Sequence, residues 1–105
     1  MASPIFIWYD KMLEFEWDLA KELANIRKHK VTFTQAVESF GDPNGLLFTD
    51  EGHSKTERRF YWVGNNTAGK VLTTRFTRRG ATIRIIGSAE WREFRRLYDE
   101  KAKQD

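Results

Sequence analysis

The stretch TTRFTRRGATIRIIG, residues 73–87, decides the fold, because apolar and polar residues alternate on both sides of a turn signal. This pattern predicts a β-hairpin with one face toward the core and the other toward solvent. If the two-residue turn consists of Arg79 and Gly80, the strands pair so that Arg75 lies opposite Arg84. The hairpin is then expected to collect arginines on one face.

The strand before this hairpin extends the same row of charges. Residues 58–64 read as a strand, and a five-residue turn at 65–69 would place Arg59 opposite Arg75. Three neighbouring strands are therefore predicted to carry a transverse row of arginines, with Arg84 at its end. The opposite face is predicted to point into the core with Phe60, Trp62, Leu72, Thr74, Phe76, Ile83 and Ile85.

A row of three like charges requires an explanation, because like charges directly opposite each other destabilise a sheet by roughly 0.2–1 kcal/mol per pair. An anion would relieve this repulsion, and guanidinium is the group best shaped to bind phosphate at two points. Alternatively, Glu57, Glu90 or Glu93 neutralises the row as a structural network. A turn of another length would instead move one arginine to the other face.

Two helices are predicted before the strands. Asp18 follows a short strand candidate and is suited to cap a helix whose apolar spacing ends near His29. Thr32 and Gln35 have the spacing of a capping box, which predicts a second helix over 31–40.

The rest of the chain completes an α+β pattern. Strands are predicted at 46–49, 58–64, 70–77 and 82–87, and a last helix from about Ser88. We therefore expect an antiparallel sheet of about four to five strands, with two N-terminal helices and one C-terminal helix.

Length and composition limit the class of protein. The 105 residues fit a single domain at 13–105, preceded by an extension at 1–12 that could add an edge strand. There is no cysteine, which excludes disulfides and thiol catalysis. The longest apolar run, PIFIWY at 4–9, is too short to span a membrane, so we expect a cytoplasmic protein. Residues 58–103 carry a net charge of +8, which would attract polyanions or acidic partners, although a basic solvated surface explains it equally well.

Few residues are suited to proton transfer. His53 lies in a polar connection, and Glu57 could be a general base or the counter-ion of Arg59. His29 could move protons, or it could simply stabilise the end of the first helix. Neither a metal-ligand pattern nor a cofactor motif is visible. The spacing of Trp17, Trp62 and Trp91 in the chain predicts that they belong to the core and do not stack on bases.

Together these segments resemble the BrnT family of type II toxin–antitoxin ribonuclease toxins. The resemblance covers about residues 13–100. It is carried, in order, by FEWDLAK at 15–21, Asn25, KH at 28–29, Val31, Phe33, Ala36, Phe40, DP at 42–43, His53, Glu57, Arg59, Gly64, TRFTRRGATIRIIG at 74–87 and LYDE at 97–100.

The resemblance implies a RelE-like fold and an endoribonuclease that is neutralised by a cognate antitoxin, usually a ribbon-helix-helix DNA-binding protein. We hypothesise that it cleaves RNA without a metal, by attack of the 2′-hydroxyl on the adjacent phosphate. A non-catalytic basic module that binds an antitoxin or nucleic acid is the alternative. The candidate catalytic residues are His53, Glu57, Arg59, Arg75 and Arg84, and the candidate RNA-binding residues are Lys28, His29, Arg78 and Arg79.

Overall fold

The structure, a computed structural model, describes residues 5–8, 13–53 and 56–104. Its elements follow the chain in the order β1 (Ile5–Trp8), β2 (Leu13–Trp17), α1 (Leu19–His29), α2 (Phe33–Ser39), β3 (Leu46–Thr49), the 3-10 helix η2 (Glu51–His53), β4 (Arg59–Asn65), β5 (Val71–Arg79), β6 (Thr82–Ala89) and α3 (Arg92–Gln104). The predicted α+β class, with two helices before the main strands and one after them, is confirmed.

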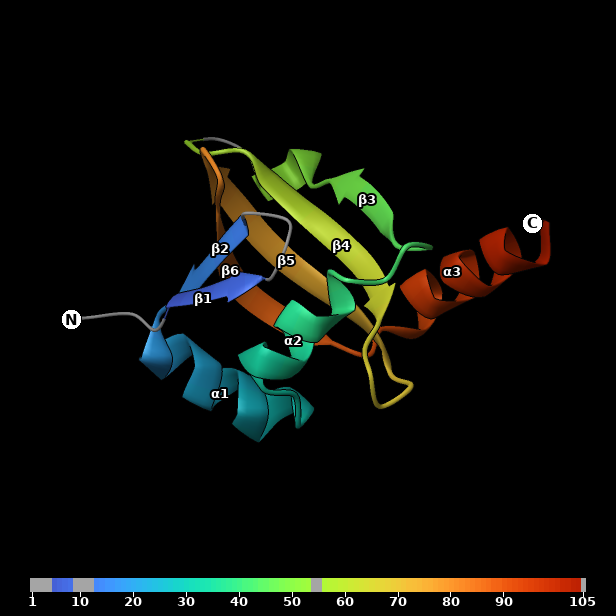
Figure 1. Ribbon diagram of the computed structural model, residues 1–105, viewed down its shortest axis with the longest axis horizontal. Helices are drawn as coiled ribbons and strands as arrows, with labels where there is room; N and C mark the ends of the chain where they lie inside the picture. The colour runs from blue at the N-terminus through green and yellow to red at the C-terminus, as the bar shows by residue number, and fades with distance from the viewer. Residues whose placement is uncertain (1–4, 9–12, 54–55, 105) are drawn as a thin grey trace.

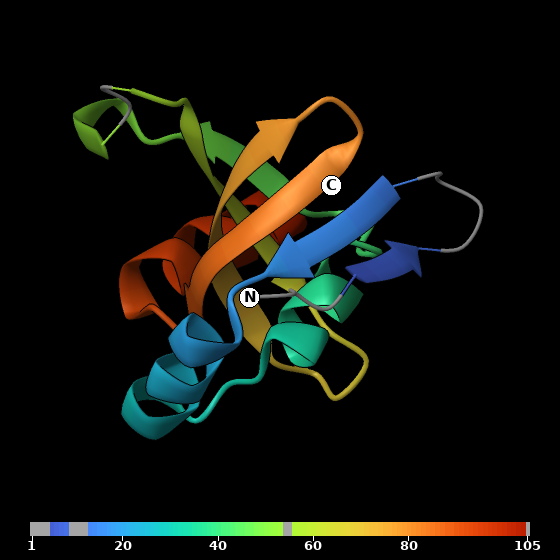
Figure 2. The same ribbon diagram turned by 90° about the vertical axis from the view of Figure 1, so that its left-hand side faces the viewer.

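The strands form one mixed sheet in the order β1-β2-β6-β5-β4-β3. β2 pairs parallel with β6, and every other neighbouring pair is antiparallel. Figure 2 shows β2 alongside β6, with β1 outside it at the edge of the sheet. The expectation of an antiparallel sheet is therefore wrong for the β2–β6 pair, which joins segments from opposite ends of the chain.

The predicted register of the β5–β6 hairpin is wrong, because the turn lies one residue later in the chain than predicted. Gly80 and Ala81, rather than Arg79 and Gly80, occupy the turn, and Arg79 pairs with Thr82. Gly80 has φ 61° at the first turn position, where a two-residue hairpin loop favours glycine. As a result Arg84 lies opposite Thr77, two residues away from the position predicted for it.

The β4–β5 register differs in the same way, because the connecting loop comprises residues 66–70 instead of 65–69. Arg59 lies opposite Thr77, and Arg75 lies opposite Tyr61. Because both shifts are by two residues, the period-two alternation is preserved and the arginines stay on one face. The direct Arg59–Arg75–Arg84 row is replaced by a staggered arrangement, in which Arg59 and Arg84 both lie opposite Thr77 and Arg75 lies two residues before Thr77 on β5.

The two N-terminal helices begin as their sequences predict. Asp18 accepts a hydrogen bond from the backbone N–H of Lys21 at 3.1 Å, and α1 ends at His29. Thr32 and Gln35 form a reciprocal capping box at the start of α2. The apolar stripe of α1 is not its buried side, however, because Leu19 and Leu23 are 45% and 52% exposed.

The core lies on the face of the sheet that α2 covers. Phe33, Ala36 and Val37 of α2 pack against strand residues, which include every residue predicted to face the core except Leu72 and Thr74. Those two are themselves fully buried, so the predicted core face is confirmed. Trp17 belongs to this cluster, and Trp62 packs against it.

The third helix packs on the opposite face. Its Phe94 contacts Phe48 of β3 and Tyr61 of β4, with ring centroids 5.5 Å and 5.2 Å apart. The helix begins at Arg92 rather than near Ser88, because β6 continues to Ala89. In Figure 1 α3 extends away from the sheet, at the opposite end of the molecule from α1 and β1. Across the described part of the chain, none of the helices has the length and apolar character needed to cross a membrane.

Candidate functional site

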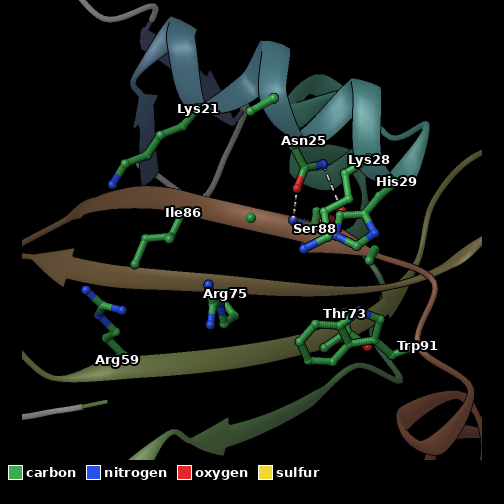
Figure 3. A pocket seen from close by; sticks show the side chains of 13 residues that line it. Lys21, Asn25, Lys28, His29, Arg59, Thr73, Arg75, Ile86, Ser88 and Trp91 are labelled. Atoms are coloured by element: carbon green, nitrogen blue, oxygen red, sulfur yellow. Dashed lines mark hydrogen bonds between the residues drawn. The ribbon is translucent and has the colours of Figure 1, made fainter.

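A cleft of about 750 Å³ lies between α1 and the face of the sheet that does not carry the main core. Lys21, Lys28 and His29 line it from α1, and Arg59 and Arg75 line it from β4 and β5. Figure 3 shows Lys21 and Arg59 toward one end of the cleft, with His29, Thr73 and Trp91 toward the other. The remaining lining residues are Ala24, Asn25, Ile86, Gly87, Ser88 and Ala89.

A buried asparagine positions α1 over the sheet. The side-chain amide of Asn25 donates to the carbonyl oxygens of Val31 at 3.0 Å and Ser88 at 2.8 Å. Its side-chain oxygen accepts from the backbone N–H of Ser88 at 3.1 Å. Three hydrogen bonds thus join the helix, the segment that follows it and the end of β6. They hold Lys28 and His29 near the sheet arginines.

An irregularity in β6 leaves space above Arg75. The register shifts between Arg75 and Phe76, so that Phe76 pairs with Ile85 whereas Arg75 pairs with Gly87. A β-bulge of this kind adds one residue to a strand and redirects the side chains beside it. Because Gly87 has no side chain, the strand opposite Arg75 contributes only backbone to the floor of the cleft at this point.

The side chain of Arg75 forms a hydrogen bond with the hydroxyl group of Tyr61. Burial raises the pKa of Tyr61, and the nearby carboxylate of Asp50, which also hydrogen-bonds to Tyr61, raises it further. Arg75 acts in the opposite direction on the same hydroxyl, by its charge and by a hydrogen bond. Tyr61 therefore keeps its proton at neutral pH and lies between a buried carboxylate and the cleft arginine.

The charge of the cleft has one sign. Among the residues that the structure describes, its lining carries four lysine and arginine side chains and one histidine, and it includes no aspartate or glutamate. Concentrated positive charge at a concave surface attracts anions and raises their local concentration. Two guanidinium groups on adjacent strands add the planar donors that suit phosphate.

Three other predicted site residues, Arg84, Glu57 and Arg79, are not part of this lining. Arg84 forms an ion pair with Glu16 of β2, its parallel neighbour in the sheet. Glu57 accepts a hydrogen bond from Arg79 at 2.9 Å, and this contact, together with the charges of Arg79, Arg59 and Arg84, lowers the pKa of Glu57. Two of the three anions that the sequence offered as counter-ions, Glu90 and Glu93, do not line the cleft either.

Arg78 and His53 are the two remaining candidates. Arg78 donates from Nε to the carbonyl oxygen of Gly80 at 2.9 Å, and it lines a separate apolar cavity of about 340 Å³ on the core side of the sheet. His53 ends the 3-10 helix η2, and its side chain is outside the part of the structure that can be described. Of the nine candidates, the structure brings together Lys28, His29, Arg59 and Arg75.

Sequence reasoning missed several lining residues. Lys21 was not singled out as a site residue, although it lies seven positions before Lys28 on the same helix face. Asn25 carried a usable signal, because asparagine is unfavourable inside a helix unless its side chain has a specific partner. Trp91, which was assigned to the core, instead lines the cleft on the opposite side of the sheet.

Comparisons with known proteins agree with the basic cleft. Residues 17–93 match the family model described as "Ribonuclease toxin, BrnT, of type II toxin-antitoxin system". This match spans all the strands and helices that line the cleft. A search of curated proteins gave no match to this chain. Within the described residues, no group of three or more histidine, cysteine, aspartate or glutamate side chains is arranged to hold a metal ion.

Proposed function

Because this chain belongs to the BrnT family of type II toxin–antitoxin ribonuclease toxins, we propose that it is a cytoplasmic, metal-independent endoribonuclease that binds the scissile phosphate of RNA in the cleft beneath α1. The observation that carries this proposal is the cluster of Lys21, Lys28, Arg59 and Arg75 around a cleft whose described lining includes no aspartate or glutamate. Membership of this family indicates RNA as the target, and we assign the binding of its scissile phosphate to this cleft.

The proposed reaction needs three kinds of group. The 2′-hydroxyl oxygen attacks the adjacent phosphorus while its proton passes to a base, and the bond from phosphorus to the 5′-oxygen breaks as that oxygen receives a proton. The products are a 2′,3′-cyclic phosphate and a 5′-hydroxyl. The charge that builds up on the phosphate oxygens during this step requires cations that are already in place.

We assign the cations to Arg59 and Arg75, with Lys28 as a further contact to the phosphate. Proton transfer falls to His29 within the cleft, to His53 at the end of η2, or to Glu57, which precedes β4. Arg84 lies across Thr77 from Arg59, where its charge contributes to the local field while it pairs with Glu16.

The test is cleavage of RNA by purified protein, free of antitoxin, in the presence of EDTA. We expect a cleavage ladder from the unmodified protein and its loss, by at least about 100-fold in rate, in Arg75→Ala, because removing one stabilising cation typically costs this much. Arg96→Ala is the matched control, because Arg96 is an exposed arginine on α3, paired only with Glu100 within the described contacts. A fully active Arg75→Ala variant would exclude this role for Arg75.

A second function, binding without catalysis, is favoured by one observation. Glu57 is engaged by Arg79, and no aspartate or glutamate is found among the described residues that line the cleft. A module of this kind would bind RNA in the same assay and leave it intact after long incubation. It would also release the RNA as salt is raised, since phosphate contacts are salt-dependent.

The family also implies an antitoxin partner. We propose that this antitoxin is a ribbon-helix-helix DNA-binding protein and that its acidic residues occupy the cationic cleft. Support comes from the positive charge of the lining, which attracts carboxylates of another chain and includes no aspartate or glutamate among the described residues. Co-expression with the adjacent open reading frame should give a co-purifying complex, and Arg59→Ala together with Arg75→Ala should weaken it. Equal retention of the double variant would place the antitoxin elsewhere.

A further inference from the structure

Trp91 occupies a position that neither core packing nor the proposed phosphate contacts explain. It follows the end of β6 and lines the cleft together with Thr73 and Arg75. Its side chain is only half-buried, so part of the indole is accessible. Figure 3 shows the indole at the end of the cleft near Thr73, below His29 of α1.

An aromatic cluster holds the indole from behind. The ring of Trp91 lies 5.9 Å from that of Tyr61 and 5.9 Å from that of Phe94. Phe94 in turn contacts Phe48, with ring centroids 5.5 Å apart. Pairs of aromatic rings at these separations attract each other. The indole is therefore supported on one side while another part of it remains accessible in a cationic cleft.

Thr73 adds a polar group at the same end of the cleft. The residue is 2% exposed, and its hydroxyl has no hydrogen-bond partner among the described protein atoms. A buried hydroxyl without a partner costs roughly 1–3 kcal/mol. Thr73 lies on β5 opposite Ala89, and Ala89 is two residues before Trp91 in the chain. A ligand with a polar edge that enters beside the indole could satisfy this hydroxyl, whereas a purely aliphatic ligand could not.

We propose that Trp91 is a stacking platform for one nucleobase of single-stranded RNA, next to the phosphate held by Arg75, and that Thr73 contacts the edge of this base. The inference rests on the proposed function for its ligand and adds a base subsite to it. Every nucleobase has an aromatic face, and stacking on an aromatic side chain contributes about 1–3 kcal/mol per base. Splayed single-stranded bases are what proteins most often recognise in RNA.

The experiment separates base binding from phosphate binding. A 2′-O-methyl oligonucleotide of about eight nucleotides, within the span of common single-strand sites, is compared with an abasic oligonucleotide of equal phosphate number. The unmodified protein should bind the base-bearing strand about tenfold more tightly, which is the affinity equivalent of one stacked base. Trp91→Leu should lose this preference, and Trp91→Phe should keep most of it.

Two control variants separate the effect of Trp91 from the effects of its neighbours. Phe94→Leu disturbs the same aromatic cluster without changing a residue that lines the cleft, so it should retain the preference for bases. Arg75→Ala should weaken both oligonucleotides alike. The idea is overturned if the unmodified protein binds both strands equally, if Trp91→Leu keeps the preference, or if Phe94→Leu loses it as fully as Trp91→Leu.

The outcome is independent of catalysis. A 2′-O-methyl strand lacks the attacking hydroxyl, so a protein that proves unable to cleave RNA can still show, or fail to show, the base preference. Conversely, cleavage of RNA that is unaffected by Trp91→Leu would leave the ribonuclease assignment intact and remove the base subsite alone.

Discussion

Asn25 of α1 and Ser88 of β6 exchange two hydrogen bonds, one in each direction, although 63 positions separate them in the chain. This pair seats the first helix on the sheet and so creates the cleft. The same asparagine also donates to the carbonyl oxygen of Val31, which ties down the segment after the helix. The buried side-chain amide of Asn25 therefore both stabilises the fold and positions the helix that lines the cleft.

Replacing Asn25 should reduce stability and binding together. Asn25→Ala leaves two backbone carbonyls and one N–H without their partners in a buried region, and we expect a loss of about 2–4 kcal/mol in the free energy of unfolding. RNA affinity should also fall, because Lys28 and His29 lose their support. Urea denaturation and oligonucleotide binding measure the two effects. Asn65→Ala, at an exposed asparagine, is the control and should change neither by more than about 0.5 kcal/mol.

Arg84 should differ from Arg75 in what its removal costs. Because Arg84 pairs with the partly buried Glu16, Arg84→Ala should lower stability by about 1 kcal/mol, whereas Arg75→Ala should mainly abolish cleavage. A double-mutant cycle with Glu16→Gln should give a coupling energy of about 0.5–1 kcal/mol. Zero coupling, combined with a loss of cleavage as large as that of Arg75→Ala, would instead show that Arg84 acts on the substrate.

The contact between Tyr98 and Asp42 should make stability depend on alkaline pH. Burial and the hydrogen bond to Asp42 raise the pKa of Tyr98 to about 12, above its ordinary value of 10.0. The folded state therefore favours protonated Tyr98, and this contribution is complete below pH 10 and is lost as pH rises toward 12. Tyr98→Phe should lower stability at pH 8 by about 1 kcal/mol. The difference between the two proteins should shrink in urea melts at pH 11 and above, and a constant difference would contradict this explanation.

The lowered pKa of Asp42 should make stability depend on pH in acid as well. Burial opposes its ionisation, but hydrogen bonds from Tyr98 and from the backbone N–H groups of Asn65 and Asn44 outweigh burial and lower the pKa of Asp42. The contribution of this carboxylate to stability is present above its ordinary pKa of 3.8 and is lost as pH falls through the lower folded value. Asp42→Asn should therefore be less stable than the unmodified protein at pH 7, with the gap narrowing in urea melts as pH falls below 3.8. A gap that persists there would mean that the charge of Asp42 is unimportant.

Thr73 and Thr77 form a natural matched pair on β5. Both are 2% exposed, and neither hydroxyl has a hydrogen-bond partner in the described part of the protein. Thr73→Val and Thr77→Val should each leave stability unchanged or raise it by up to about 1 kcal/mol, since no hydrogen bond is lost. Only Thr73 lines the cleft, so only Thr73→Val should weaken RNA binding. Equal binding by both variants would remove Thr73 from the base subsite.

Local chemistry made much of this fold predictable. Asp18 and the Thr32–Gln35 pair mark two helix starts because capping satisfies backbone groups within a few residues. The alternation in β4, β5 and β6 separates a core face from a charged face, and that division survived two errors of register because each shifted the pairing by two residues. The grouping of Arg59 and Arg75 on one face follows from the same alternation.

What the amino-acid sequence determined by itself is thus the set of helices and strands, the core face of the sheet and the gathering of positive charge. Only the tertiary structure decided which charges meet. Arg84 pairs with Glu16 because β2 joins β6 in parallel, and Arg75 has an open space above it because the bulge places Gly87 opposite. Lys28 and His29 reach the cleft because Asn25 bonds to Ser88. Each of these contacts joins segments far apart in the chain, so its energy depends on the whole packing arrangement and leaves no periodic signal in the sequence.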